Sequence, residues 1–263
     1  MPGAVKVFGS PTSSEVARVL ACLFEKDVEF QLIRVDSFRG PNRMPQYLKL
    51  QPHGEALTFE DGNVTLVESR KILRHIADKY KAQGNPDLIG MGALERSSIE
   101  QWLQTEAQSF DVPSADMIYS LGFLPPTMPL DGKKDGAGNG AGGRDARQQQ
   151  QQQKQQGMMM NPTHVQKLEE MKQLFEKSSK DLGKVLDIYD QRLEEAEYLA
   201  GDKFTLADLS HMPNADRLAS DPRSARLIQS RTNVSRWWAD VSARESWVYV
   251  KSLQRPPASE APF

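Results

Sequence analysis

The N-terminal part of the chain alternates between the hydrophobic spacing of strands and that of helices. Residues 4–8 form an apolar run that predicts a short buried strand. Apolar side chains four residues apart then predict a helix over 13–25, and Ser13 or Ser14 is suited to cap its start. Residues 28–34 alternate apolar and polar positions, which is typical of a half-buried strand. The chain therefore opens as strand, helix and strand.

A predicted hairpin and a second helix follow an irregular stretch. Residues 56–60 and 63–67 predict two short strands that turn at Asp61-Gly62, a dipeptide typical of two-residue hairpin loops. Residues 68–80 then carry apolar side chains on one side of a helix. A strand–helix–strand unit followed by a hairpin predicts a mixed sheet, with parallel and antiparallel neighbours.

The later part of the chain has helical periodicity only. Two apolar stripes, over 99–110 and 182–193, predict amphipathic helices. The sequence TLAD at 205–208 predicts a capping box with aspartate in place of Glu or Gln. A single last helix is expected near the C-terminus. The expected helical faces are Ile99, Trp102, Leu103, Glu106 and Phe110, then Leu182, Val185, Leu186, Tyr189 and Leu193, and on the last helix Trp237, Trp238, Val241 and Trp247.

Residues 125–162 interrupt this helical pattern with prolines, a Gly-rich run and a Gln tract at 148–156. Such a composition buries too little apolar surface to offset the entropy of ordering, so we expect a disordered insertion. Two alternatives stay open, since the glutamines suit an extension of the next helix or a partner-binding segment. The predicted organisation is an α+β domain at 1–82, a linker at 83–93 and an all-helical domain at 94–263.

Composition and charge exclude several kinds of partner. The 263 residues carry a net charge of -2, so no basic surplus is present for nucleic acid or an anionic membrane. The mean hydropathy is -0.58, and no apolar run reaches the roughly 18 residues that a membrane span needs. The start of the chain does not resemble a secretory signal. The four histidines lack the spacing of metal ligands, so we expect no metal.

The single cysteine, Cys22, cannot form an internal disulfide. A reducing, cytoplasmic setting therefore suits the chain. Because Cys22 falls on or near the apolar face of the first predicted helix, we expect a buried structural thiol rather than a redox sensor.

Several segments together resemble the plant phi-class glutathione transferases. SSEVARV at 13–19 is similar to the family's STNVARV, and DGNVTLVESRKI at 61–72 is similar to its DGDLTLFESRAI. The resemblance extends over almost the whole chain outside 125–162. The remaining matches are KVLDIYDQRL at 184–193, EYLAGDKFTLADLSHMPN at 197–214 and RWWADVSARESW at 236–247.

This resemblance implies a fold, an activity and an assembly. The fold is a thioredoxin-like α+β domain that carries the glutathione pocket, followed by an all-α domain. The activity is conjugation of the glutathione thiolate to hydrophobic electrophiles, as in detoxification, with glutathione as co-substrate and no further cofactor. Family members usually form homodimers, and we expect a cytoplasmic homodimer here.

Ser13 is the residue that the resemblance places beside the glutathione sulfur. A free thiol has a pKa of about 8.5, so the reactive thiolate is scarce at neutral pH. A hydroxyl donor and the positive end of a helix both favour the thiolate. From the residues alone, a helix cap is the simpler interpretation of Ser13, whereas the resemblance favours thiolate stabilisation.

The resemblance also implies residues that bind the two ends of glutathione. Glu68 and Ser69 match the family's Glu-Ser pair, which holds the γ-glutamyl end at a helix start. The alternative for Glu68 is a solvated acidic residue in the first turn of a helix. Asn42 and Arg43 stand where the family usually has His-Lys, and Arg43 can still pair with the glycyl carboxylate.

Glu55, Ala56 and Leu57 depart from the family's Gln-Val-Pro, which ends in a cis-proline. The backbone at Ala56 corresponds to the one that pairs with the cysteinyl unit of glutathione. A cis bond before Leu57 would cost about 2.5–4 kcal/mol, against about 0.5–1 kcal/mol before proline.

A weakened site favours an alternative function, that of a non-catalytic ligandin or flavonoid and anthocyanin carrier. An interaction scaffold is a third hypothesis, which rests on the Gln-rich insertion.

The electrophile is expected between the two domains, against the helical one. Candidate residues for this second substrate site are Phe38, Met117, Ile118, Tyr119 and Phe123. For each of them, packing in the hydrophobic core is the alternative interpretation.

Overall fold

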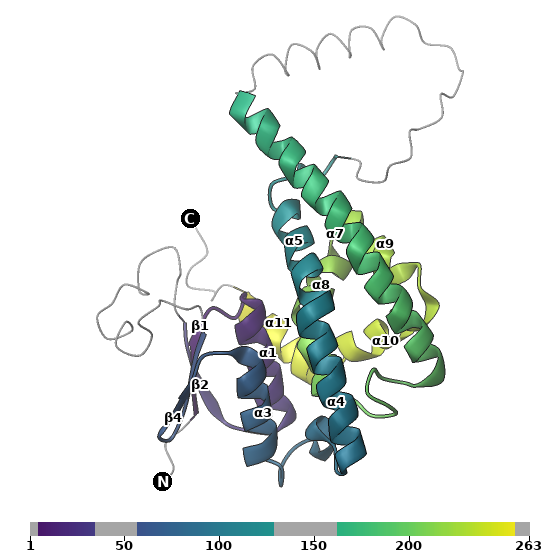
Figure 1. Cartoon of the computed structure of the whole chain (residues 1–263). Helices are drawn as coiled ribbons and strands as arrows, with labels where there is room; N and C mark the ends of the chain where they lie inside the picture. Colours follow the sequence, from purple (N-terminus) through teal and green to yellow (C-terminus); the bar gives the residue numbers. More distant parts are fainter. Residues whose placement is uncertain (1–4, 35–56, 129–161, 256–263) are drawn as a thin grey trace, which may run out of the picture.

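The computed structural model describes residues 5–34, 57–128 and 162–255, which Figure 1 draws as a coloured ribbon. The predictions for Phe38, Asn42, Arg43, Glu55, Ala56 and residues 129–161 lie outside the described residues.

The N-terminal part is a four-stranded mixed sheet with two helices, as the hydrophobic pattern predicts. The strand order is β2-β1-β3-β4, with β1 parallel to β2 and antiparallel to β3. Gly62 makes the tight turn between β3 and β4 with a φ of 65°, a conformation that glycine adopts at no steric cost. The elements are β1 (Val5–Gly9), α1 (Ser14–Glu25), β2 (Phe30–Ile33), β3 (Leu57–Asp61), β4 (Val64–Leu66) and α3 (Ser69–Lys79).

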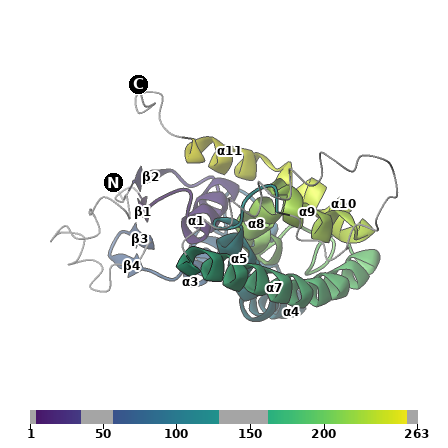
Figure 2. The same cartoon turned by 90° about the horizontal axis from the view of Figure 1, so that it is seen from above.

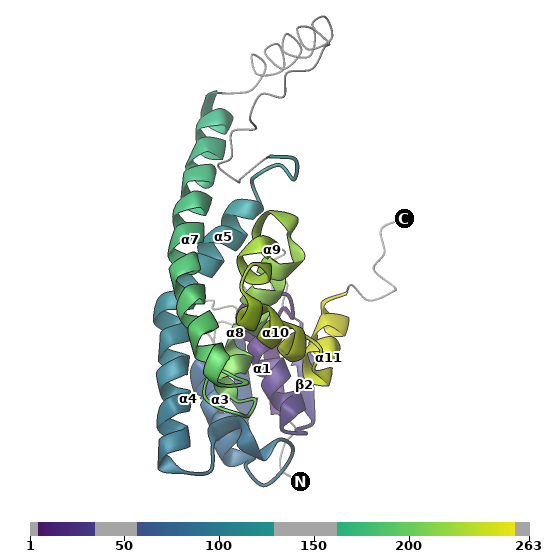
Figure 3. The same ribbon diagram turned by 90° about the vertical axis from the view of Figure 1, so that its right-hand side faces the viewer.

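The helical part begins beside α3 and packs against α1 and α3. Figure 2 shows these two helices between the sheet and the rest of the molecule. In Figure 3, α4, α5 and α7 run along one side and α8 lies in the middle. The elements are the 3₁₀ turn η2 (Pro86–Ile89), α4 (Ala93–Thr105), the π-helical turn η3 (Glu106–Phe110), α5 (Asp111–Leu121), α7 (Pro162–Glu195), α8 (Leu206–Ser220), α9 (Pro222–Gln229), α10 (Thr232–Ser242) and α11 (Glu245–Gln254).

The helix α8 forms the centre of the core, and most of its side chains are buried. The capping box predicted at its start is confirmed between Thr205 and Asp208. The fully buried Asp208 carboxylate accepts hydrogen bonds from the Thr205 and Leu199 backbone amides and from the Trp237 indole. Asp208 therefore joins the start of α8 to α10 and to the loop before α8.

The prediction of a single last helix is wrong, because the chain bends at Arg244 and forms α10 and α11. Arg244 has an extended backbone, with φ -61° and ψ 139°, and its guanidinium donates two hydrogen bonds of 2.8 Å to Glu25 at the end of α1. This contact joins residues 219 positions apart in the sequence. Local periodicity carries no signal for such a contact.

The predicted buried stripe on α7 is confirmed, since Leu182, Leu186, Tyr189 and Leu193 are buried. Cys22 is fully buried within α1, and burial raises the pKa of its thiol well above the usual range. The thiol is therefore a packing group rather than a reactive one. Among the described helices, none has the length and apolar character that crossing a membrane requires.

Candidate active site

The start of α1 presents a serine hydroxyl that the helix does not use. Ser13 is the N-cap residue by its backbone, with φ -71° and ψ 135°, and its carbonyl accepts a hydrogen bond from the Ala17 amide at 2.9 Å. Its side chain makes no capping hydrogen bond. The neighbouring Ser14 differs, because its hydroxyl donates to the Asn214 side chain at 2.8 Å. The Ser13 hydroxyl is therefore left available at the positive end of a helix.

The start of α3 carries a second hydroxyl without a partner. Ser69 is fully buried, and its Oγ has no hydrogen-bond partner among the described residues. A buried hydroxyl without a partner is costly, so such a group marks a strained or ligand-binding position. Glu68 precedes it as the N-cap, and its carboxylate accepts from the Arg70 and Lys71 amides at 3.1 and 2.8 Å.

The starts of α1 and α3 influence each other electrostatically. Glu15, in the first turn of α1, has a raised pKa, chiefly because it is partly buried. Arg18 and Arg70 oppose this rise, while the nearby charge of Glu68 adds to it. The two helix starts thus lie within electrostatic range of each other.

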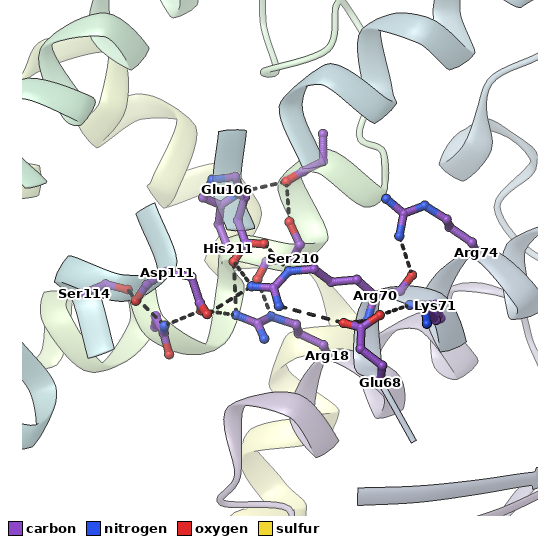
Figure 4. Close-up of polar contacts among 12 residues, drawn as sticks. Arg18, Glu68, Arg70, Lys71, Arg74, Glu106, Asp111, Ser114, Ser210 and His211 are labelled. Atoms are coloured by element: carbon purple, nitrogen blue, oxygen red, sulfur yellow. Dashed lines mark hydrogen bonds and ion pairs between the residues drawn. The ribbon is translucent and has the colours of Figure 1, made fainter. Parts of the chain in front are cut away.

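Two arginines and two acids form a largely buried group between the sheet domain and the helical domain, drawn in Figure 4. We call Arg18, Arg70, Glu106 and Asp111 the interdomain ion network. Arg18 is 1% exposed and Glu106 is 0% exposed. Arg18 lies 3.1 Å from Glu106 and 2.8 Å from Asp111. Arg70 lies 2.7 Å from Glu106 and 3.1 Å from Asp111, so each guanidinium contacts both acids.

The pKa values of the two acids shift in opposite directions. Burial raises the pKa of Glu106, and the two arginines only partly oppose this rise. Burial also acts to raise the pKa of Asp111, but Arg18 and Arg70 outweigh it and hold that pKa below its usual range. The π-helical turn at Glu106–Phe110 brings both acids to the arginines. Because Arg70 follows Ser69 directly, the network also fixes the start of α3.

An open surface hollow of about 540 Å³ lies where the end of α5 meets the end of α8 and the start of α9. Arg217 lines it and donates a hydrogen bond to the Thr12 carbonyl, next to Ser13. The other lining residues are Ile118, Leu121, Gly122, Ser220, Asp221 and Pro222. The hollow therefore combines apolar walls with an arginine whose guanidinium reaches the residue before Ser13.

Comparison with known proteins gives the chain its family. The family model described as glutathione S-transferase, N-terminal domain, matches residues 3–78, and the model of the C-terminal domain matches residues 149–245. Glutathione S-transferase F11 of Arabidopsis thaliana is 35% identical over 249 residues, which cover 95% of this chain and 98% of that protein. The chain belongs to the phi-class glutathione S-transferases. Glutathione S-transferase PARB of Nicotiana tabacum is also 35% identical, over 96% of this chain and 98% of its own.

Solved structures agree with this family. The crystal structure of glutathione transferase F2 from Populus trichocarpa has a TM-score of 0.74 and 40% sequence identity, and the match covers 95% of this chain and 98% of that one. A serine-to-cysteine variant of poplar glutathione transferase F1 has a TM-score of 0.74 and 38% identity, over 96% and 98% of the two chains. The thioredoxin-like domain followed by an all-helical domain is thus the fold of this transferase.

The structure separates the candidates for the electrophile site of this transferase. Met117 is fully buried in the core, whereas Ile118 lines the hollow. Tyr119 and Phe123 are 54% and 45% exposed, and their rings lie 5.0 Å apart. Neither of them lines the hollow.

Sequence reasoning missed Arg217 and the importance of Glu106. Arg217 lies one helical turn after Asn214, which ends the segment that resembles the family, so its spacing could have drawn attention to it. Glu106 was expected on a helical face, but the turn that surrounds it is π-helical rather than α-helical. Leu57 is buried and pairs with Gly9 at the start of β3.

Proposed function

We propose that this glutathione S-transferase conjugates the thiolate of glutathione to hydrophobic electrophiles, and that the Ser13 hydroxyl stabilises the thiolate. The observation that carries the proposal is the Ser13 hydroxyl, which lies at the start of α1 without a capping hydrogen bond. Ser14 is the only neighbouring alternative in the matched segment, and its hydroxyl already donates to Asn214. Ser13 is therefore the serine with a hydrogen to donate to sulfur.

Hydrogen bonding and the helix terminus both lower the pKa of a bound thiol. A hydrogen bond to the charged form of a group favours that form, and so does the positive end of a helix. In the reaction, the sulfur forms a bond to the electrophilic carbon, and the leaving group departs with the bonding electron pair. The thiol proton passes to solvent. The chain supplies position and charge stabilisation, and glutathione is a co-substrate rather than a resident cofactor.

The same proposal assigns the ends of glutathione to the predicted residues. The γ-glutamyl carboxylate would meet the unpartnered Ser69 hydroxyl, and its ammonium group would meet Glu68. Glu68 has room for such a contact, since its side chain is 40% exposed. The glycyl end and the cysteinyl backbone are assigned to Asn42, Arg43, Glu55 and Ala56 on the resemblance alone.

The hollow between α5, α8 and α9 is the proposed place of the electrophile. Ile118, Leu121 and Pro222 give it apolar walls. Phe38, Tyr119 and Phe123 remain candidates for the electrophile site on the resemblance alone. The buried position of Met117 favours core packing for that residue.

A homodimer in the cytoplasm completes the proposal. The proposed domains are 1–82 and 94–263, joined by a linker at 83–93. The dimer is a family expectation. The lone buried cysteine is compatible with a reducing compartment. No observation in the described residues favours a non-catalytic carrier.

The first test is calorimetric titration of the purified protein with glutathione, followed by kinetics with chlorodinitrobenzene. We expect binding in the millimolar range or tighter and glutathione-dependent conjugation. Folded protein that shows neither heat of binding at more than one temperature nor conjugation would contradict the proposed function.

A further inference from the structure

Three polar contacts join Thr12 and the first half of α1 to α8, and two of them involve the residues on either side of Ser13. Towards the N-terminus of α1 the partners come from later positions in α8, so the two helices run in opposite directions at this contact. Figure 2 shows them side by side. The three contacts are Arg18 Nε to the Ser210 carbonyl at 2.7 Å, Ser14 Oγ to Asn214 Oδ1 at 2.8 Å, and Arg217 Nη2 to the Thr12 carbonyl.

The other partners of Asn214 determine which group donates in its hydrogen bond with Ser14. This side chain is 3% exposed, and its amide nitrogen donates to Ser114 Oγ at 2.9 Å and to Asp111 Oδ1 at 3.2 Å. Both amide hydrogens are thus used on α5. The amide oxygen can only accept, so the Ser14 hydroxyl must donate its hydrogen to it.

Two consequences follow for the adjacent serine. The residues on both sides of Ser13 are held by α8, Thr12 through its carbonyl and Ser14 through its side chain. A hydrogen bond weakens steeply when its angle or distance departs from the optimum. A donor that must meet a thiolate therefore depends on how firmly its backbone is placed.

We infer that Asn214 and Arg217 are positioning residues for Ser13: they hold Ser14 and Thr12 so that the Ser13 hydroxyl is aimed at the glutathione sulfur. The inference rests on the proposed role of Ser13. It assigns to α8, in the helical domain, a part in activating a thiol that is bound on the other domain.

Ser14→Ala is the decisive variant, because it removes one hydroxyl and leaves Asn214 bonded to α5. The matched control is Ser246→Ala. Ser246 also ties α1 to the helical domain, since its hydroxyl donates to Glu25 at 2.6 Å at the opposite end of the same helix. Ser14→Thr keeps the hydroxyl and tests rescue. Asn214→Ala and Ser13→Ala complete the set, and the double variant Ser13→Ala/Ser14→Ala tests dependence on Ser13.

The readouts are kcat/KM with chlorodinitrobenzene, the pKa of bound glutathione from thiolate absorbance, and amide hydrogen exchange over residues 10–17 of the free protein. In Ser14→Ala we expect a fall of about fivefold in kcat/KM, the effect of one ordinary hydrogen bond. We also expect a raised pKa of the bound thiol and faster exchange over residues 10–17. Ser246→Ala should leave all three readouts as in the native protein, and Ser14→Thr should restore them.

The kcat/KM of the double variant should be no lower than that of Ser13→Ala, because positioning acts only through Ser13. The inference is overturned if Ser14→Ala matches Ser246→Ala in hydrogen exchange and in the pKa of the bound thiol. It is also overturned if Ser14→Ala lowers kcat/KM by the same factor in the Ser13→Ala background as in the native protein. Failure of the proposed function looks different, since the native protein would then show no conjugation or Ser13→Ala would match it. In that case the exchange readout still tests the contact itself. Amide exchange over residues 10–17 that is no faster in Ser14→Ala than in the native protein would show that the contact does not hold this segment.

Discussion

The interdomain ion network and the two serines at the starts of α1 and α3 use the same pair of helices, but they satisfy their polar groups differently. Within the network every guanidinium and carboxylate has a partner from the chain itself. Ser13 makes no capping bond, and Ser69 Oγ has no partner among the described residues. The network thus serves the fold, whereas our proposal assigns the two hydroxyls to glutathione. A hydroxyl without a partner beside satisfied polar groups is therefore a candidate for ligand binding, which mutation can test.

The largest effect is expected from breaking the network with Glu106→Ala. Removal of one partner from a buried ion pair leaves uncompensated charge and typically costs about 3–5 kcal/mol. Urea unfolding at neutral pH measures the change. Glu100→Ala is the matched control, because Glu100 also pairs with an arginine of α3 but is 49% exposed. An exposed pair contributes about 1 kcal/mol or less. Equal losses in the two variants would contradict the assigned role of burial.

Ser13→Ala separates activity from stability. Loss of a hydrogen bond to a charged group costs about 1.5–3 kcal/mol, which corresponds to roughly 10- to 150-fold in kcat/KM. The free energy of unfolding should stay within about 0.5 kcal/mol of the native value, because this side chain caps nothing. A stability loss typical of a lost helix cap, with activity retained, would return Ser13 to a purely structural role.

The contrast extends to Asp61, a carboxylate that the chain satisfies itself. Burial acts to raise its pKa, but hydrogen bonds from Lys79, His75 and Tyr80 outweigh burial and hold the pKa below its usual value. Stability from a depressed carboxylate pKa is complete above the unfolded value of about 3.9 and is lost as the pH falls through the folded value. Asp61→Asn should therefore cost about 1–2 kcal/mol at pH 7.

The free energies of unfolding of the native protein and of Asp61→Asn, measured across acidic pH, test this direction of the pH dependence. The advantage of the native protein over Asp61→Asn should shrink only below about pH 4. An advantage that grows as the pH falls would contradict the depressed pKa.

The smallest effect is expected for Ser69→Ala, and it should appear in binding alone. Because the hydroxyl is buried without a partner, its removal should leave the unfolding free energy of the free protein unchanged or slightly higher. Glutathione affinity should fall about fivefold, as for one lost hydrogen bond. Calorimetry measures the affinity and urea unfolding the stability. A destabilised free protein with unchanged affinity would show that the hydroxyl belongs to the fold.

Much of the fold could be predicted from local patterns. The sheet, the hairpin at Gly62, the capping box at Thr205 and the start of α1 at Ser13 all depend on residues close together in the sequence. The bend at Arg244 and the π-helical turn at Glu106 could not be predicted, since each depends on charges brought from α1 and α3 by folding.

The candidate site divides in the same way. Ser13, Glu68 and Ser69 were found because they fall in short segments that resemble the family. Asn214 and Arg217 as positioning residues were not found, since they act across about 200 positions of the chain. Whether a hydroxyl has a partner is a property of packing, which only the structure supplies.

The most direct test is to measure the pKa of the glutathione thiol bound to the native protein and to Ser13→Ala. Thiolate absorbance as a function of pH, at saturating glutathione, gives this pKa. We predict that the pKa of the bound thiol lies well below the free value of about 8.5 in the native protein and returns towards that value in Ser13→Ala. The same low pKa in both proteins would contradict the claim that Ser13 stabilises the thiolate.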